Sequence, residues 1–246
     1  MKVIVQKFGG TSVRDDLSRK LACDHVSEAV TKGYKVIVVV SAMGRKGEPY
    51  ATDTLLSLVE ANRLMPREQD LLVSCGELIS AVVFTDLLLS LGLKVTAFSG
   101  AKAGFKTNDE FTNAKITEMN CDQLLQQFDH VDVVVVAGFQ GQTEDGDIAT
   151  LGRGGSDTSA TALGAAVNAE WVDIFSDVEG IMTADPKIVE TAKPLEVITY
   201  EELSNLAYQG AKVIHPRAVE IAMQAQVPIH IRPTYSKEKV LRLHPN

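Results

Sequence analysis

The chain has 246 residues and a formal net charge of −8, and 45% of its residues are hydrophobic. This composition is that of a folded protein with a full hydrophobic core, so global disorder is excluded. The acidic balance, without a basic cluster, argues against nucleic acid as a partner. We also expect no membrane partner and a cytoplasmic location, because we find neither a signal-peptide pattern nor an apolar stretch of membrane-spanning length.

Strands and helices are predicted to alternate along the chain. The patterning places strands at 2–8, 35–40, 95–98, 132–137, 171–175 and 228–231, and helices at 15–31, 51–62, 66–91, 156–168, 200–208 and 216–225. This order predicts an α/β protein with a largely parallel sheet covered by helices. The Gly-, Asp- and Thr-rich segment 139–155 is the candidate boundary between two lobes, about 1–150 and about 151–235, followed by a tail at 236–246. Ligands of such sheets bind beyond the carboxyl ends of the strands.

The first strand runs directly into the motif KFGGTS at residues 7–12, and a predicted helix follows. Gly9 and Gly10 allow an anion to approach the backbone, and a helix N-terminus offers free N–H groups to it. Lys7 adds a mobile positive charge that suits phosphoryl transfer. A sharp bend between strand and helix would need the same glycines, so this motif alone favours phosphate binding only slightly. It matches neither the P-loop nor the dinucleotide fingerprint.

A second glycine-rich motif, LGRGGSDTS, occupies residues 151–159 before an alanine-rich helix. Ser156 or Asp157 could serve only as a helix cap. That interpretation leaves Arg153 unexplained, because an arginine among glycines can present its guanidinium group to a carboxylate or phosphate. Asp157 could instead orient Lys7 or a metal–nucleotide complex. Two such motifs together favour an anion-binding site.

Glu77 lies in the apolar helix predicted at 66–91, directly after Gly76. It either faces solvent or is buried, and a buried carboxylate needs a cationic partner. A buried Glu77 would suit an ammonium group, and Arg153 a carboxylate. The pair therefore suggests an amino-acid zwitterion as ligand.

Together, the motifs at 7–13, 151–158 and 210–216 resemble those of the catalytic domain of aspartokinases, in the amino acid kinase superfamily. The resemblance covers residues 2 to about 235. It implies a three-layer α/β/α fold, Mg-ATP, a homodimer, and transfer of the ATP γ-phosphoryl group to the side chain of L-aspartate. The product would be 4-phospho-L-aspartate, at the start of the pathway to lysine, diaminopimelate, threonine and methionine. Aspartokinases commonly carry regulatory domains, and we expect none within this chain.

The resemblance also implies roles for individual residues. Its catalytic residues would be Lys7, Gly9, Gly10 and Asp157. Its aspartate-binding residues would be Ser41, Thr52, Glu77, Phe139, Arg153, Gly154 and Ser156. Its nucleotide-binding residues would be Lys7, Gly10, Ser12, Ser176, Asp177, Met182, Lys187 and Lys212. No protein side chain is expected to form a dedicated metal site. This chain departs from the family at two of these positions. It has Lys187 where many relatives have arginine and Met182 where many have an aromatic residue.

Two other classes of function compete with this interpretation. Kinases of acetylglutamate, glutamate or UMP share the fold, but Glu77, Arg153 and the KFGGTS motif favour aspartate. A non-catalytic sensor of amino acids or nucleotides would be favoured by loss of Lys7 or Asp157, and both are present.

Overall fold

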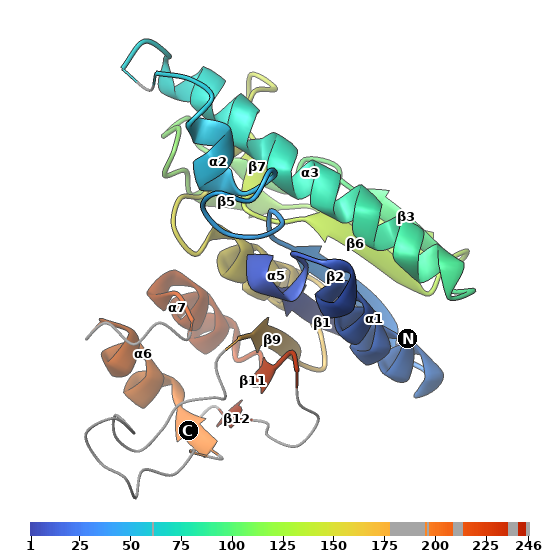
Figure 1. Ribbon diagram of the computed structural model, residues 1–246. Helices are drawn as coiled ribbons and strands as arrows, with labels where there is room; N and C mark the ends of the chain where they lie inside the picture. The colour runs from blue at the N-terminus through green and yellow to red at the C-terminus, as the bar shows by residue number, and fades with distance from the viewer. Residues whose placement is uncertain (61, 178–194, 196, 209–213, 236–240, 245–246) are drawn as a thin grey trace, which may run out of the picture.

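A computed structural model of the protein describes residues 1–60, 62–177, 195, 197–208, 214–235 and 241–244 (Figure 1). Its elements, in chain order, are β1 (Val3–Phe8), the 3-10 helix η1 (Gly10–Ser12), α1 (Asp16–Thr31), β2 (Lys35–Val40), α2 (Thr52–Leu56), α3 (Pro66–Ser90), β3 (Val95–Phe98), β4 (Phe105–Thr107), β5 (Ile116–Met119), α4 (Asp122–Gln127), β6 (Val133–Ala137), β7 (Gln140–Gln142), β8 (Ile148–Thr150), α5 (Gly155–Ala166), β9 (Val172–Ser176), β10 (Val197–Thr199), α6 (Tyr200–Tyr208), α7 (Pro216–Ala225), β11 (Ile229–Pro233) and β12 (Leu241–His244).

The central sheet has the strand order β10-β12-β11-β9-β1-β2-β6-β3. The six strands from β11 to β3 are parallel to their neighbours, whereas β12 runs antiparallel to β11. The prediction of an α/β fold with a largely parallel sheet is confirmed. Because β1 pairs with β2 on one side and β9 on the other, the carboxyl ends of these three strands lie side by side.

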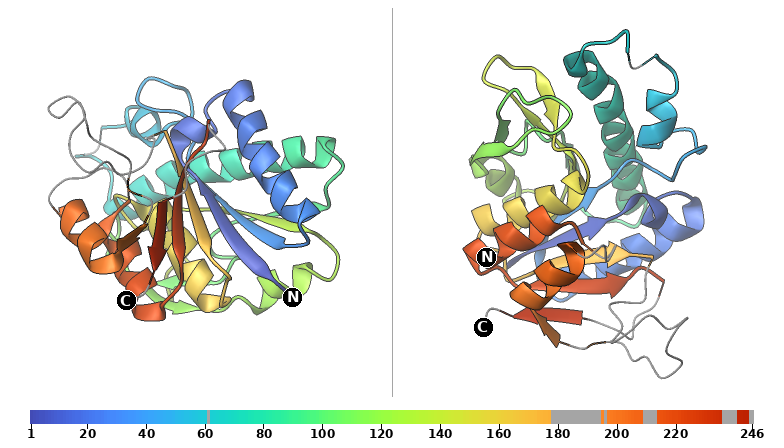
Figure 2. Two further views of the ribbon diagram at one scale, coloured as in Figure 1. Left: turned by 90° about the horizontal axis from the view of Figure 1, so that it is seen from below. Right: turned by 90° about the vertical axis from the view of Figure 1, so that its left-hand side faces the viewer.

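Helices cover both faces of this sheet, so the expected three layers are present (Figure 2). Alternate residues of each strand serve opposite faces. Ile4 and Val38 pack with α1 and α3, whereas Val5 and Val39 pack with α5 and α7. The valine runs of β2 and β6 are buried because both faces of those strands are covered.

A second sheet, in the order β5-β4-β7-β8, was not predicted from the sequence. Its strands have three or four residues, too few to establish a period of two. The segment 139–155 contains two of them, β7 and β8, rather than only a loop. The lobe boundary proposed there stays a prediction.

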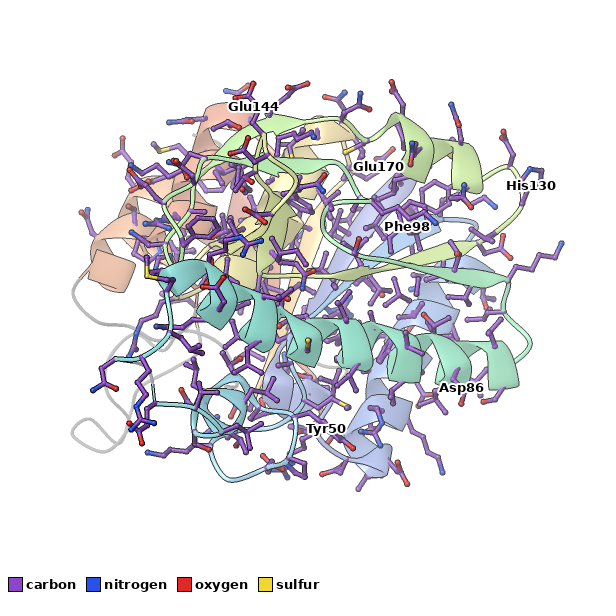
Figure 3. The ribbon with its side chains drawn as sticks, turned by 90° about the horizontal axis from the view of Figure 1, so that it is seen from above. Tyr50, Asp86, Phe98, His130, Glu144 and Glu170 are labelled. Carbon is purple, nitrogen blue, oxygen red and sulfur yellow. The ribbon has the colours of Figure 1, made fainter. Side chains whose placement is uncertain are left out.

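Helix α3 corrects one sequence-based expectation. It is 25 residues long with a mean hydropathy of 1.9 in its most apolar window, so by length and composition alone it could cross a membrane. Figure 3 shows it running across the molecule, where Val73, Phe84 and Leu88 are buried in the core. A core helix passes the same test of length and hydropathy, so this finding gives only weak support for a membrane span.

Candidate active site

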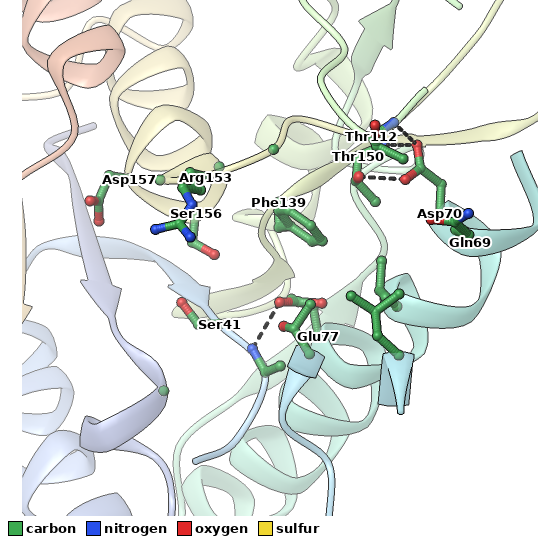
Figure 4. A pocket seen from close by; sticks show the side chains of 18 of the residues that line it. Ser41, Gln69, Asp70, Glu77, Thr112, Phe139, Thr150, Arg153, Ser156 and Asp157 are labelled. Carbon is green, nitrogen blue, oxygen red and sulfur yellow. Dashed lines mark hydrogen bonds between the residues drawn. The ribbon is translucent and has the colours of Figure 1, made fainter. Parts of the chain in front are cut away.

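A cavity of about 450 Å³ lies beyond the carboxyl ends of β1 and β2 (Figure 4). Its walls come from β1, the turn after β2, α2, α3 and the loops that flank β7, β8 and α5. The lining residues are Lys7, Gly10, Ser41, Ala42, Gly44, Thr52, Leu56, Gln69, Asp70, Val73, Glu77, Thr112, Phe139, Thr150, Gly152, Arg153, Gly154, Gly155, Ser156 and Asp157.

One end of the cavity contains a cation–carboxylate pair. Lys7 leaves the end of β1, Asp157 leaves the first turn of α5, and their Nζ and Oδ1 atoms are 2.7 Å apart. The two side chains are only 12% and 14% exposed, so water screens this attraction less than it would at the surface. The pair therefore holds the Lys7 ammonium group in place at the carboxyl end of β1.

Gly10 allows two loops to meet beside Lys7. Its carbonyl oxygen accepts a hydrogen bond from Gly44 N–H at 3.0 Å. A Cβ atom at position 10 would lie 2.6 Å from the Gly44 oxygen and 2.8 Å from the Ala42 oxygen, so only glycine fits there. Gly9 lies next to Lys7, because a Cβ at position 9 would be 3.4 Å from Lys7 Nζ. The KFGGTS motif thus places backbone amides beside the cation.

The interpretation of Ser156 or Asp157 as the cap of α5 is wrong. The N-cap is Gly154, with φ +68°, and no side chain caps the helix. A Cβ at Gly154 would lie 2.2 Å from the Cβ of His215, so this turn packs tightly on the start of α7. Within the described residues, no ion pair joins Arg153 to another side chain, and its guanidinium group is exposed at the cavity.

Glu77 is buried, so the prediction of a buried carboxylate is confirmed and the solvent-facing alternative is excluded. It is 2% exposed, and its Oε1 accepts a hydrogen bond from Ala42 N–H at 3.0 Å. Its Oε2 is buried without a hydrogen-bond partner in the described structure. Burial raises the pKa of Glu77 to about 8, an effect that the Ala42 hydrogen bond opposes. A cation bound beside Glu77 would favour its ionised form and oppose this rise in pKa.

Glu77 and Arg153 approach the cavity from opposite sides (Figure 4). The other predicted aspartate-binding residues line the same cavity, namely Ser41, Thr52, Phe139, Gly154 and Ser156. Phe139 has a positive φ of 69°, a conformation that a bulky residue rarely adopts. Its N–H donates to Ser159 Oγ at 3.0 Å, which ties this residue to α5.

The predicted nucleotide-binding residues are less closely grouped. Ser12 is fully buried, and its hydroxyl group lies 2.6 Å from that of Thr234, away from the cavity lining. Ser176 ends β9, and Asp177 forms an ion pair with Arg45. Met182, Lys187 and Lys212 lie outside the described residues.

Sequence reasoning did not identify the group formed by Asp70, Thr112 and Thr150. Asp70 is a buried carboxylate in the same apolar helix as Glu77, seven residues earlier. Like Glu77, Asp70 is an acidic residue beside apolar ones in this helix, and this signal could have identified it. Its partners depend on the second sheet, which was not predicted.

The molecule is an α/β protein whose largely parallel sheet carries a lysine, two glycines and an aspartate at a cavity at its carboxyl edge. The sequence model of the Amino acid kinase family matches residues 2–233, and the chain belongs to that family. UMP kinase from Bacillus anthracis shares the fold, with a TM-score of 0.71 and 16% identity over 100% of this chain and 96% of the other.

Several similar proteins are aspartokinases. Aspartokinase 1 of Bacillus subtilis is 67% identical over 97% of this chain and 60% of its own length. Aspartokinase of Geobacillus stearothermophilus is 44% identical over 97% of this chain and 58% of its own. The chain therefore spans about 60% of the length of these relatives. The structure of aspartokinase III from E. coli in complex with aspartate and ADP has a TM-score of 0.84 and 28% identity, over 100% of this chain and 65% of that one.

Proposed function

We propose that this chain transfers the γ-phosphoryl group of ATP to the side-chain carboxylate of L-aspartate and so forms 4-phospho-L-aspartate, the first step toward lysine, diaminopimelate, threonine and methionine. One observation carries the proposal: the buried carboxylate of Glu77, with one oxygen unpartnered, lines the same cavity as Arg153 and the Lys7–Asp157 pair. The similarity of the chain to aspartokinases supports the same reaction.

The cavity offers complementary groups for each charge of aspartate. The ammonium group would pair with Glu77, whose free oxygen otherwise remains buried without a partner. The α-carboxylate would pair with the guanidinium group of Arg153, and Ser41, Thr52, Phe139, Gly154 and Ser156 would complete the pocket. The side-chain carboxylate then points toward Lys7.

The acceptor needs no general base, because an aspartate side chain is already ionised at neutral pH. The difficulty is to bring this anion against a polyphosphate. Lys7 and the amides of Gly9 and Gly10 would place positive charge and hydrogen-bond donors at the transferring group, and Asp157 would hold Lys7 in position.

ATP would place its phosphates at Lys7 and Gly10. Ser12, Ser176, Asp177, Met182, Lys187 and Lys212 remain further candidate nucleotide-binding residues. The described residues contain no group of three or more His, Cys, Asp or Glu side chains that could hold a metal ion. Mg²⁺ would therefore enter with the phosphates, and Asp157 is the cavity carboxylate that lies beside Lys7. Mg²⁺ supplies further neutralisation of phosphate charge.

The test is an assay that couples ADP release to a spectroscopic signal. We expect ADP release with ATP and L-aspartate and background release with L-glutamate, N-acetylglutamate or UMP as the acceptor. Release with one of those three acceptors instead would identify another kinase of the family. Binding of ATP and aspartate without turnover would identify a sensor.

We further propose that the protein is cytoplasmic and acts as a homodimer, with a substrate lobe at about 1–150 and a nucleotide lobe at about 151–235. Arg153, Gly154 and Ser156 would reach the aspartate from the nucleotide lobe, and Lys7 and Gly10 would reach the phosphates from the substrate lobe. Sedimentation equilibrium gives the mass directly. We expect about twice the 26.6 kDa of one chain, and a mass of 26.6 kDa would contradict the dimer.

A further inference from the structure

The carboxylate of Asp70 is fully engaged inside the protein. It is 0% exposed, and its Oδ2 accepts hydrogen bonds from the backbone N–H groups of Thr112 at 2.8 Å and Thr150 at 2.7 Å. Its Oδ1 accepts a third from the hydroxyl group of Thr150 at 2.6 Å. Although Asp70 lines the cavity, both oxygens are occupied by protein donors, so it is poorly placed to bind substrate itself (Figure 4).

These hydrogen bonds connect the two sides of the proposed aspartate site. Asp70 and Glu77 lie two turns apart on the same face of α3, about 10 Å along the helix axis. Thr150 ends β8, three residues before Arg153. The Asp70–Thr150 contact therefore joins the helix that carries Glu77 to the loop that carries Arg153.

A second set of contacts holds the same loop from α7. Arg217 donates from Nη1 to the Leu151 carbonyl at 3.0 Å and from Nη2 to Asn113 Oδ1 at 2.7 Å. Asn113 follows Thr112, whose N–H is bound by Asp70 and whose φ of 68° is unusual for a β-branched residue. The residues before Arg153 thus lie between Asp70 on one side and Arg217 on the other.

We propose that Asp70 is a positioning residue that sets the spacing between Glu77 and Arg153, and thereby the affinity for the amino-acid substrate. This inference rests on the proposed function of the site. It differs from a purely structural role in one respect: loss of Asp70 should affect the amino-acid substrate more than the nucleotide. The Lys7–Asp157 pair is connected to the fold through β1 and α5, outside the Asp70 contacts.

The main experiment compares Asp70→Ala with Asp70→Asn. In Asp70→Asn, the amide oxygen can still accept from the two backbone N–H groups, and the NH2 group can donate to Thr150 Oγ1. We expect Asp70→Ala to raise the KM for aspartate about tenfold or more and the KM for ATP less than about twofold, since small misplacements of binding groups are costly. Asp70→Asn should restore the KM for aspartate to within about threefold of the wild type, because the hydrogen bonds remain.

Asp86→Ala is the matched control, because Asp86 is an exposed aspartate on the same helix. It should leave both KM values unchanged. Equal increases in the two KM values for Asp70→Ala, or an Asp70→Asn protein as impaired as Asp70→Ala, would overturn the proposal.

Two further measurements keep the test decisive. If Asp70→Ala does not fold, Thr150→Val removes only the hydroxyl contact. It should again raise the KM for aspartate more than the KM for ATP.

Hydrogen exchange is measured on the ligand-free protein and does not depend on activity. It therefore tests the role of Asp70 separately from the proposed function. The amides of Thr112 and Thr150 should exchange about tenfold faster in Asp70→Ala than in the wild type, while β6 is unchanged. Unchanged exchange at both amides would refute the role of Asp70 even in an active enzyme.

Discussion

At the scale of single residues, the cavity concentrates a few charged groups whose neighbours are close and well defined. The protein as a whole is acidic, with a net charge of −8, while both proposed substrates are anions. Attraction must therefore come from individual cations at the site. Lys7 and Arg153 are the cations among the cavity-lining residues.

Lys7→Ala removes the cation at the proposed point of transfer. We expect kcat to fall about a hundredfold or more, as for the loss of one preorganised donor to developing negative charge. The far-ultraviolet circular dichroism should be that of the wild type, because Lys7 is the penultimate residue of β1 and its ammonium group pairs with Asp157 at the cavity. The measurement is the coupled ADP assay at saturating ATP and aspartate. Lys20→Ala, at an exposed lysine on α1, is the control and should keep wild-type turnover. A Lys7→Ala enzyme with near-normal kcat would rule out this role.

The buried carboxyl group of Glu77 predicts a pH dependence of stability. Its pKa is raised from 4.5 to about 8 in the ligand-free folded protein, chiefly by burial. Between these values the folded protein binds more protons than the unfolded chain, so this group's contribution to stability falls as pH rises. The limiting slope is about 1.4 kcal/mol per pH unit for one proton.

Glu77→Gln removes this titration while keeping the size of the side chain. We expect the free energy of unfolding of the wild type, relative to Glu77→Gln, to decrease from about pH 5 to pH 8 and to level off on both sides. Urea titrations of both proteins at several pH values measure this difference in the free energy of unfolding. A difference that is constant with pH would show that Glu77 titrates normally in the folded state.

At the scale of elements, the contact between α3 and the turn after β2 carries Glu77 to its place. Gly76 faces this turn: a Cβ there would lie 2.8 Å from Ala42 Cβ and 2.9 Å from the Tyr50 carbonyl oxygen. Alanine favours a helix over glycine by up to about 1 kcal/mol. At Gly76 the steric cost of the added Cβ should exceed this gain in helix propensity, because the Tyr50 carbonyl oxygen belongs to the backbone and cannot move aside as a flexible side chain could.

Gly76→Ala should therefore lower the free energy of unfolding by about 1–3 kcal/mol, as for an overpacked core. It should also raise the KM for aspartate, since α3 must move away from Ala42, whose N–H holds Glu77. Chemical denaturation and steady-state kinetics measure the two effects. Cys75→Ala, at the exposed neighbouring position, is the control and should leave both nearly unchanged. A Gly76→Ala protein more stable than the wild type would show that the turn adapts at little cost.

The elements also show how far the sequence could predict this structure. The six parallel strands and the long helices were predictable, because continuous valine and isoleucine runs and 3.6-residue periods identify covered strands and helices. The strands β4, β5, β7 and β8 were not, because they depend on pairing with one another rather than on a local pattern. In the site, too, some residues were recognisable from the local sequence and others were not. Lys7, Glu77 and Arg153 stood out by residue type, whereas Asp70 acquires its meaning from partners in the unpredicted sheet.

At the scale of the whole molecule, the proposed aspartate site draws residues from distant parts of the chain. Glu77 lies within α3, whereas Ser41, Phe139 and Arg153 follow β2, β6 and β8, so these residues meet only in the folded protein. A ligand that binds them therefore binds the native state and not the unfolded chain, so it must raise global stability by mass action. The increase in the free energy of unfolding depends only on the free ligand concentration relative to its Kd.

L-aspartate at about 100 times its Kd should stabilise the protein by about 2.7 kcal/mol. For a chain of this length, that corresponds to a rise in Tm of about 5–10 °C. Differential scanning calorimetry at pH 8 measures it. Succinate carries both carboxylates without the ammonium group, so at the same concentration it should give a much smaller shift. Glu77→Ala should abolish the difference between the two ligands, because it removes the only charged partner that we assign to that group. Equal shifts from aspartate and succinate in the wild type would mean that the cavity recognises a dicarboxylate rather than an amino acid, and Glu77 would then need another role.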